Sequence, residues 1–104
     1  MTNNRFGGML GLCQKAGKVS SGEFSCEKAL KSGNAKLCIV AEGASENTLK
    51  HFKDMCSYRK VPIILGFIGS DELGHIIGKK DRVVVTVNDA GFAAGLQKIV
   101  EGGK

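Results

Sequence analysis

The residues able to do acid–base or nucleophilic chemistry are few in this chain, and they form no recognised catalytic pattern. His51 and His75 are the only histidines, and His51 lies on the polar side of its helical pattern, which favours a surface position over catalysis or metal ligation. The ten carboxylates are scattered singly and fit helix caps or solvated faces better than an acid–base pair. A phosphate-binding loop is not indicated, because Val19 follows Gly17-Lys18 where Ser or Thr is required. The sequence therefore predicts no enzyme, no cofactor and no small-molecule substrate.

Four cysteines, Cys13, Cys26, Cys38 and Cys56, are the other reactive side chains. Their separations of 13, 12 and 18 residues match neither zinc-ligand pairs nor a Cys-x-x-Cys redox motif. Each lies in an apolar pattern, so reduced cysteines that pack as small hydrophobic side chains are predicted, with no metal site. A Cys–His nucleophile pair stays open as an alternative, since such partners meet in space and not in sequence order.

Two segments carry groups suited to an anionic partner. In the first, Lys18 to Lys28, small hydroxyl residues and Gly22 begin a predicted helix whose free backbone N–H groups can receive phosphate oxygens. Phe24 in this segment can stack on a base or can staple the start of the helix. The second segment, Gly78-Lys-Lys-Asp-Arg82, is a basic loop. Each segment taken alone fits an ordinary capped helix or a solvated turn.

The overall charge also favours an anionic partner. Fifteen Lys and Arg residues against ten Asp and Glu residues give a formal net charge of +5, which bears on association rather than on fold. Apolar runs such as residues 37–41 are far shorter than the ~20 residues that span a bilayer. Gly7 and Gly8 interrupt the apolar region that a secretory signal would need. We therefore expect one cytoplasmic domain over residues 1–104, with no membrane partner.

Helices and strands are predicted to alternate along the whole chain. Helical spacing of apolar residues covers 6–16, 22–32, 45–60, 70–77 and 89–102, whereas extended or continuous apolar runs cover 18–21, 36–41, 61–65 and 82–87. The predicted N-caps are Ser21, Ser45 and Asp89, and Gly102-Gly103 is the predicted end of the last helix. The runs 36–41 and 61–65 are expected to be buried strands. This order predicts an α/β fold, a three-layer α/β/α sandwich around a mixed four-stranded sheet.

The order of these elements, together with several short motifs, resembles the ribosomal protein L7Ae family over residues 5 to 100. The motifs are the glycine-started helix ending in Lys28-Ala-Leu-Lys-Ser-Gly33, the strand Ala35-Lys-Leu-Cys-Ile-Val-Ala41, the Val61-Pro62 start of the next strand, and Leu73-Gly74-x-x-x-Gly78 before the last strand. Two more, Ala44-Ser-x-Asn-Thr48 and Gly78-Lys-x-x-Arg-Val-Val-Val85, look closest to the small bacterial members. The resemblance implies this fold and a structured RNA as partner, since members of the family include kink-turn RNA binders.

In that family the RNA is held by the start of the second helix, typically Gly-x-Asn-Glu-x-x-Lys, and by the loop before the last strand. Here Gly22 and Lys28 match, and Phe24 and Ser25 replace the Asn-Glu pair. The loop is charged where kink-turn binders usually present apolar residues. The RNA-binding residues expected from the resemblance and from the two basic segments are Ser21, Gly22, Glu23, Phe24, Ser25, Lys28, Lys31, Gly78, Lys79, Lys80 and Arg82.

The leading hypothesis is a non-catalytic RNA-binding protein associated with ribosomal or another structured RNA, with a ribosomal or other protein as a possible further partner. The alternative is a protein-interaction module that kept the fold but lost specific RNA recognition.

Overall fold

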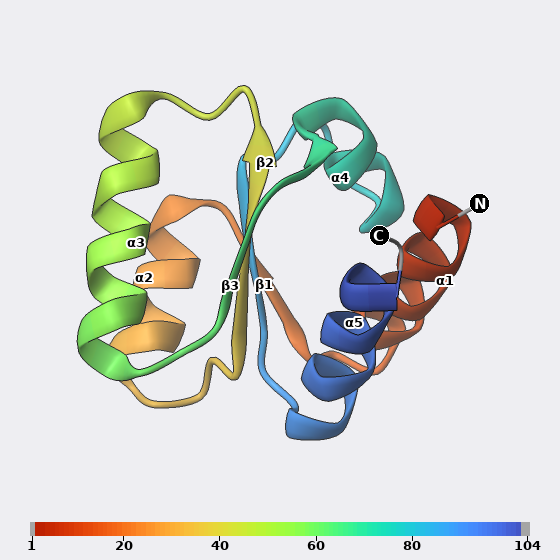
Figure 1. Ribbon diagram of the computed structural model, residues 1–104, viewed down its shortest axis with the longest axis horizontal. Helices are drawn as coiled ribbons and strands as arrows, with labels where there is room; N and C mark the ends of the chain where they lie inside the picture. The colour runs from red at the N-terminus through yellow and green to blue at the C-terminus, as the bar shows by residue number, and fades with distance from the viewer. Residues whose placement is uncertain (1, 103–104) are drawn as a thin grey trace.

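The computed structural model describes residues 2–102 as five helices and four strands in one α/β fold. In chain order they are α1 (Thr2–Lys15), β1 (Val19–Ser21), α2 (Glu23–Lys31), β2 (Leu37–Glu42), α3 (Glu46–Arg59), β3 (Ile63–Gly69), α4 (Ser70–Ile76), β4 (Val84–Val87) and α5 (Ala90–Gly102). Figure 1 shows three layers, with α2 and α3 on one face of the sheet and α1, α4 and α5 on the other. The predicted fold class is confirmed. Within the described part of the chain, no helix is long and apolar enough to cross a membrane.

The sheet is mixed, and its strands lie in the order β1-β4-β2-β3. β4 pairs antiparallel with β1 on one side and with β2 on the other, whereas β2 and β3 are parallel. Because β4 runs against both of its neighbours, the carboxyl ends of β1 and β2 lie at the same end of the sheet as the start of β4. The residues that leave or enter these three strands are therefore neighbours in space.

Two apolar cores lie on opposite faces of the sheet, and β2 contributes to both. Leu37 and Ile39 pack toward α1, α4 and α5, whereas Cys38 and Val40 pack toward α2 and α3. Successive side chains of a strand point to opposite faces, so a strand covered on both sides needs a continuous apolar run. The interpretation of residues 36–41 as a central buried strand is confirmed.

Two local predictions are wrong. The strand after Pro62 was expected to be buried, but β3 has a partner on one side only, and Leu65 is 43% exposed. Ser21 was expected to cap α2, but it pairs with Val85 as the last residue of β1, and Gly22 precedes the helix without a side-chain cap. Strand pairing competes with capping for the same residue, and here the pairing prevails.

The other two predicted caps are confirmed. The Ser45 hydroxyl accepts a hydrogen bond from the backbone N–H of Thr48 at 3.1 Å, and the Asp89 carboxylate accepts one from the N–H of Phe92 at 2.9 Å. Each satisfies an N–H group that has no partner inside its helix. Of the predicted end of α5, Gly102 is the last helical residue, and Gly103 lies outside the described residues.

The loop before β4 lies directly against α4, and Gly74 makes this possible. A Cβ atom added at Gly74 would lie 1.9 Å from the carbonyl oxygen of Lys80. The backbone N–H of Lys79 donates to the Gly74 carbonyl at 2.8 Å, and that of Arg82 donates to the Ser70 carbonyl at 3.1 Å. The backbone of the basic loop is thus held on α4 at a distance that only glycine permits.

Replacing Gly74 with alanine is expected to lower the free energy of unfolding by about 1–3 kcal/mol, because the added methyl group overlaps backbone atoms that must move. Gly8 in α1 is the matched control, since a Cβ there meets nothing within 4 Å. Gly8→Ala is expected to raise the free energy of unfolding by about 0.5–1 kcal/mol through helix propensity. Denaturant unfolding followed by circular dichroism measures both. A Gly74→Ala variant as stable as the wild type would contradict the close approach of loop and helix.

Candidate functional site

The two predicted segments meet at one end of the sheet. The backbone N–H of Gly22, just before α2, donates to the Val84 carbonyl at 3.1 Å, and Arg82 lies two residues before Val84. The N–H of Ala41 donates to the Val83 carbonyl at 2.8 Å, so the end of β2 is also adjacent. These segments are some sixty residues apart in the sequence, and the pairing of β4 with β1 and β2 brings them side by side.

The start of α2 is open to a ligand. Gly22 has a φ of 88°, a left-handed conformation that glycine adopts without strain, and no side chain caps the helix among the described residues. The first intrahelical hydrogen bond runs from Cys26 to Gly22, so the N–H groups of Glu23, Phe24 and Ser25 lack helical acceptors. Such groups, together with the positive end of the helix dipole, suit an anion.

Glu23 is the negative charge closest to this helix start, and it is engaged by α3. Its carboxylate accepts a hydrogen bond from the Thr48 hydroxyl at 3.0 Å. One turn later, Glu27 contacts the ring of His51 at 2.6 Å. Both carboxylates of α2 are therefore directed to α3, and they link the two helices along their shared face.

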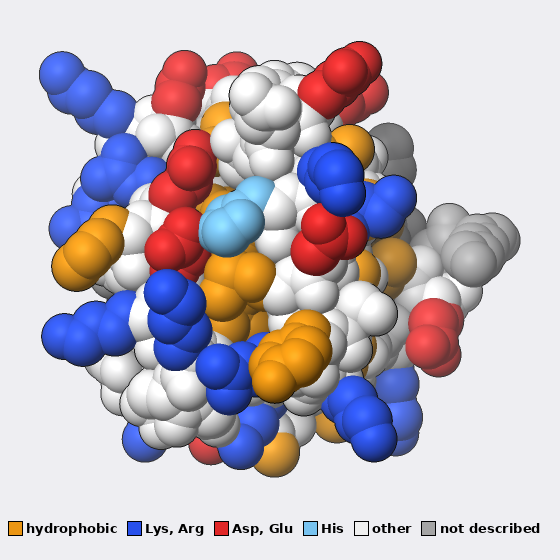
Figure 2. All heavy atoms as spheres, turned by 90° about the vertical axis from the view of Figure 1, so that its left-hand side faces the viewer, with side chains coloured by type: hydrophobic (Ala, Val, Ile, Leu, Met, Phe, Trp, Pro, Cys, Tyr) orange, Lys and Arg blue, Asp and Glu red, His pale blue; other side chains and the backbone are white. Residues whose placement is uncertain are grey.

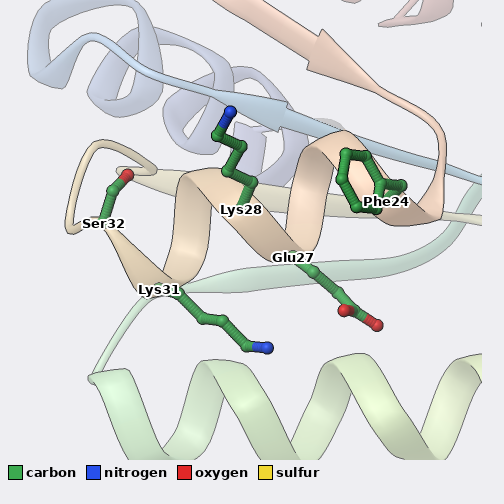
Figure 3. A pocket seen from close by; sticks show the side chains of 5 residues that line it. All are labelled: Phe24, Glu27, Lys28, Lys31 and Ser32. Carbon is green, nitrogen blue, oxygen red and sulfur yellow. The ribbon is translucent and has the colours of Figure 1, made fainter.

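The outward face of α2 carries an exposed aromatic ring beside two cations. Phe24 is 80% exposed, so the interpretation that it staples the start of the helix is wrong. It lines a shallow hollow of about 390 Å³ together with Glu27, Lys28, Lys31 and Ser32. Figure 3 shows Phe24 and Lys28 on one side of the helix, while Glu27 and Lys31 point toward α3.

Positive charge continues from α2 to neighbouring parts of the surface. Lys79 and Lys80 are exposed in the basic loop, where Gly78 adopts a φ of 74° and Arg82 is half-buried. The Arg82 guanidinium donates to the Asp81 carbonyl at 3.0 Å, which fixes its position within the loop. Figure 2, which faces α2 and α3, shows Lys and Arg side chains down the left edge and at the lower end, where α2 and α3 end, which is the end opposite the basic loop.

One predicted residue lies apart from the others. Lys31 is the last residue of α2, eight residues after Glu23, which corresponds to ~12 Å along the helix axis. It shares the hollow with Phe24 and Lys28, but it belongs to the far end of the helix from the basic loop. The predicted residues therefore form two groups, one at the end of the sheet and one along α2.

Sequence reasoning missed a polar hollow on the other side of α2. This hollow, of about 300 Å³, is lined by Ser20, Ser25, Lys28, Ala29, Ser32, Asn34 and Asn88. The buried Thr86 hydroxyl donates to the Asn88 side-chain oxygen at 3.1 Å, and the Asn88 amide donates to the Ser20 hydroxyl at 3.0 Å. Asn88 and Ser20 are 68 residues apart and meet only through the pairing of β1 with β4, so no local signal could have found them.

The remaining reactive groups do not assemble into a catalytic arrangement within residues 2–102. No cluster of three His, Cys, Asp or Glu side chains there could hold a metal ion. All four cysteines are free and buried, as predicted. Burial raises the pKa of Cys13 to about 11 and that of Cys26 to about 12, and a hydrogen bond to Cys56 together with burial raises the pKa of Cys38. These three thiols stay protonated at neutral pH, whereas a hydrogen bond with Cys38 lowers the pKa of Cys56, which is buried as well.

Fold and surface together define a small three-layer α/β protein with a cationic face built on a glycine-started helix and the loop before the last strand. The family model described as the ribosomal protein L7Ae/L30e/S12e/Gadd45 family matches residues 5–97. The chain belongs to this family, as the sequence motifs predicted.

Named relatives and a solved structure support the assignment. The chain is 43% identical over 93 residues to the RNA-binding protein YlxQ of Bacillus subtilis, an alignment that covers 89% of this chain and 92% of the relative. It is 42% identical over 86 residues to the large ribosomal subunit protein eL30 of Eremothecium gossypii, covering 79% of each. A solved structure of a protein of unknown function from Bacillus halodurans superposes with a TM-score of 0.89 at 32% identity, covering 93% of this chain and 97% of that one.

The native protein is expected to react very slowly with a thiol reagent such as Ellman's reagent at pH 8, because all four cysteines are buried and the pKa values of Cys13, Cys26 and Cys38 are raised. Pre-incubation in denaturant is the control, and there all four thiols are expected to react at once. The measurement is the absorbance of the released reagent over time. Rapid reaction of one cysteine in the native state would reopen the Cys–His alternative and with it an enzymatic role.

Proposed function

We propose that the protein is a non-catalytic, cytoplasmic RNA-binding protein whose single domain binds structured RNA at the end of the sheet where α2 begins. The observation that carries the proposal is the pairing of β1 with β4, which sets the open start of α2 beside the basic loop. The names of two relatives, an RNA-binding protein and a ribosomal protein, support it. The excess of positive charge supports it as well.

In this proposal the contacts to the RNA backbone come from two sources. The free N–H groups at the start of α2 donate hydrogen bonds to phosphate oxygens. Because these donors carry no net charge, their contribution depends on local geometry and little on salt. Lys28, Lys79, Lys80 and Arg82 neutralise phosphates and release counterions, which makes affinity fall with rising salt. Contacts of both kinds position the RNA without reading its sequence.

Ribosomal RNA and kink-turn RNA are the structured targets that we propose, by analogy with the family. The chain differs from the family pattern at Phe24 and Ser25, so a kink-turn would have to be read without the Asn-Glu pair. Ser25 keeps a hydroxyl that can donate or accept a hydrogen bond at a base edge. Phe24 offers a ring for stacking instead of an amide.

A protein-interaction module is the second candidate, and one feature of the sheet favours it. β3 is an edge strand, and its outer edge borders a hollow of about 410 Å³ lined by Ile63, Leu65, Phe67 and Val100 among others. An exposed edge strand beside apolar side chains can add an extended segment of another protein. Capture of a protein partner that survives ribonuclease treatment would favour this candidate over the first.

To test the proposal, the affinity of the purified protein is measured for a standard kink-turn RNA and for a matched straight duplex, each in a salt series. We expect Lys28→Ala to reduce the slope of log affinity against log salt by about 1, because one phosphate contact is lost. Lys98→Ala is the matched control, since Lys98 is an exposed lysine on α5, in the opposite layer. The salt dependence of RNA affinity of this variant is expected to equal that of the wild type.

Comparison of the two RNAs distinguishes a protein that recognises the kink-turn from one that binds phosphates of another target. Selective binding to the kink-turn would support recognition through Phe24 and Ser25, and equal salt-dependent binding to both would support a phosphate-reading protein with another target. Salt-insensitive or absent binding across structured RNAs would contradict the proposal. Equal effects of the two lysine variants would argue against the proposed face.

A further inference from the structure

The two hollows beside α2 adjoin each other, because Lys28 and Ser32 line both of them. We propose that together they bind one unpaired nucleotide of the RNA, with its base on the ring of Phe24 and its phosphate or base oxygens in the polar hollow. This inference rests on the proposed function and extends it to a second contact surface along α2. This second surface shares Phe24 and Lys28 with the surface proposed above and adds the polar hollow, which extends along α2 away from the basic loop.

Phe24 is placed to receive a base. Its ring is 80% exposed on a regular helix, although burial would be the favourable state for an apolar side chain of this size. Lys28 follows it by four residues, so the two side chains are neighbours on the helix surface, as Figure 3 shows. An aromatic ring beside a cation is the pairing that binds a base by stacking and the adjoining phosphate by charge.

The polar hollow presents hydrogen-bond donors, and their direction is set from the interior. Thr86 is fully buried and donates to the Asn88 oxygen, so the Asn88 nitrogen must face Ser20. An Asn amide nitrogen has two protons, and only one of them is used by Ser20. The second proton, the Ser20 hydroxyl proton and the Lys28 ammonium are three donors available to a ligand.

The groups that line the polar hollow indicate which class of ligand it can bind. No carboxylate lines it among the described residues, and its remaining polar groups are hydroxyl and amide groups. Donors without a negative charge suit an acceptor-rich group, which a phosphate or the carbonyl edge of a pyrimidine provides. The combined hollows are of a size that a small ligand fills.

An unpaired nucleotide fits this arrangement better than a base pair. In a duplex both faces of a base are covered by its neighbours, so the base can reach a protein ring only when it is splayed out. Phe24 is the second residue of α2, at the border of the place proposed for the structured RNA, and the polar hollow continues from Ser25 along the helix to Ser32. A nucleotide at a bulge or loop next to the structured part could therefore reach them through Lys28.

The inference is tested by NMR on the full chain labelled with ¹⁵N, titrated with hexauridylate as the single-stranded probe and with a straight RNA duplex. We expect hexauridylate to shift the backbone signals of Phe24 and Lys28 and the side-chain amide signal of Asn88. Phe24→Leu is expected to weaken hexauridylate binding about tenfold, because the apolar bulk remains but the aromatic face is lost. Phe24→Tyr keeps the ring and is expected to bind like the wild type.

Tyr58→Leu is the matched control, because Tyr58 on α3 is also 80% exposed, and its affinity for hexauridylate is expected to stay unchanged. If the kink-turn or the duplex binds but hexauridylate does not shift the signals of Phe24, Lys28 and Asn88, this inference is overturned and the proposed function stands. Equal losses for Phe24→Leu and Tyr58→Leu would overturn it too. Failure of every RNA to bind would overturn both proposals.

Discussion

The antiparallel pairing of β4 between β1 and β2 is the interaction on which the arrangement of this surface depends. All four residues of β4 are buried, and its valines pack into the cores on both faces of the sheet. Burying such a side chain stabilises the fold by roughly 1.5–3 kcal/mol, so the strand is fixed firmly in its place. Because β4 is fixed, the residues just before and just after it are also fixed relative to β1 and α2.

Both ends of β4 matter for this reason. At its start, the Val84 carbonyl accepts from Gly22, and the basic loop is brought to the open end of α2. At its end, Asn88 follows Val87 and reaches Ser20, the middle residue of β1. One short strand thus positions the proposed backbone-binding surface and orients the polar hollow that we propose for an unpaired nucleotide. Gly74 also contributes to the backbone-binding surface, because the basic loop can lie against α4 only where no Cβ atom is present.

The family pattern is changed in this chain where side chains face solvent, and kept where the backbone must adopt a particular conformation. Gly22 keeps the left-handed φ at the start of α2, and Gly74 keeps the close contact with the basic loop. Phe24 and Ser25, by contrast, are exposed and carry no core contact that would restrict their identity. Because the strands and glycines maintain the fold, exposed positions such as 24 and 25 can change residue type, and with it the ligand that the surface recognises.

The sequence by itself determined the fold class, the order of the elements and the central position of residues 36–41, because each is set by local periodicity. It also determined the caps at Ser45 and Asp89, because each cap is a side chain that bonds its own helix. It also predicted the two basic segments. Only the tertiary structure decided that these segments are adjacent, that β3 is an exposed edge and that Ser21 ends a strand instead of capping a helix. The exposure of Phe24 and the Thr86–Asn88–Ser20 chain likewise depend on which strands pair, and strand pairing joins residues that are distant in the sequence.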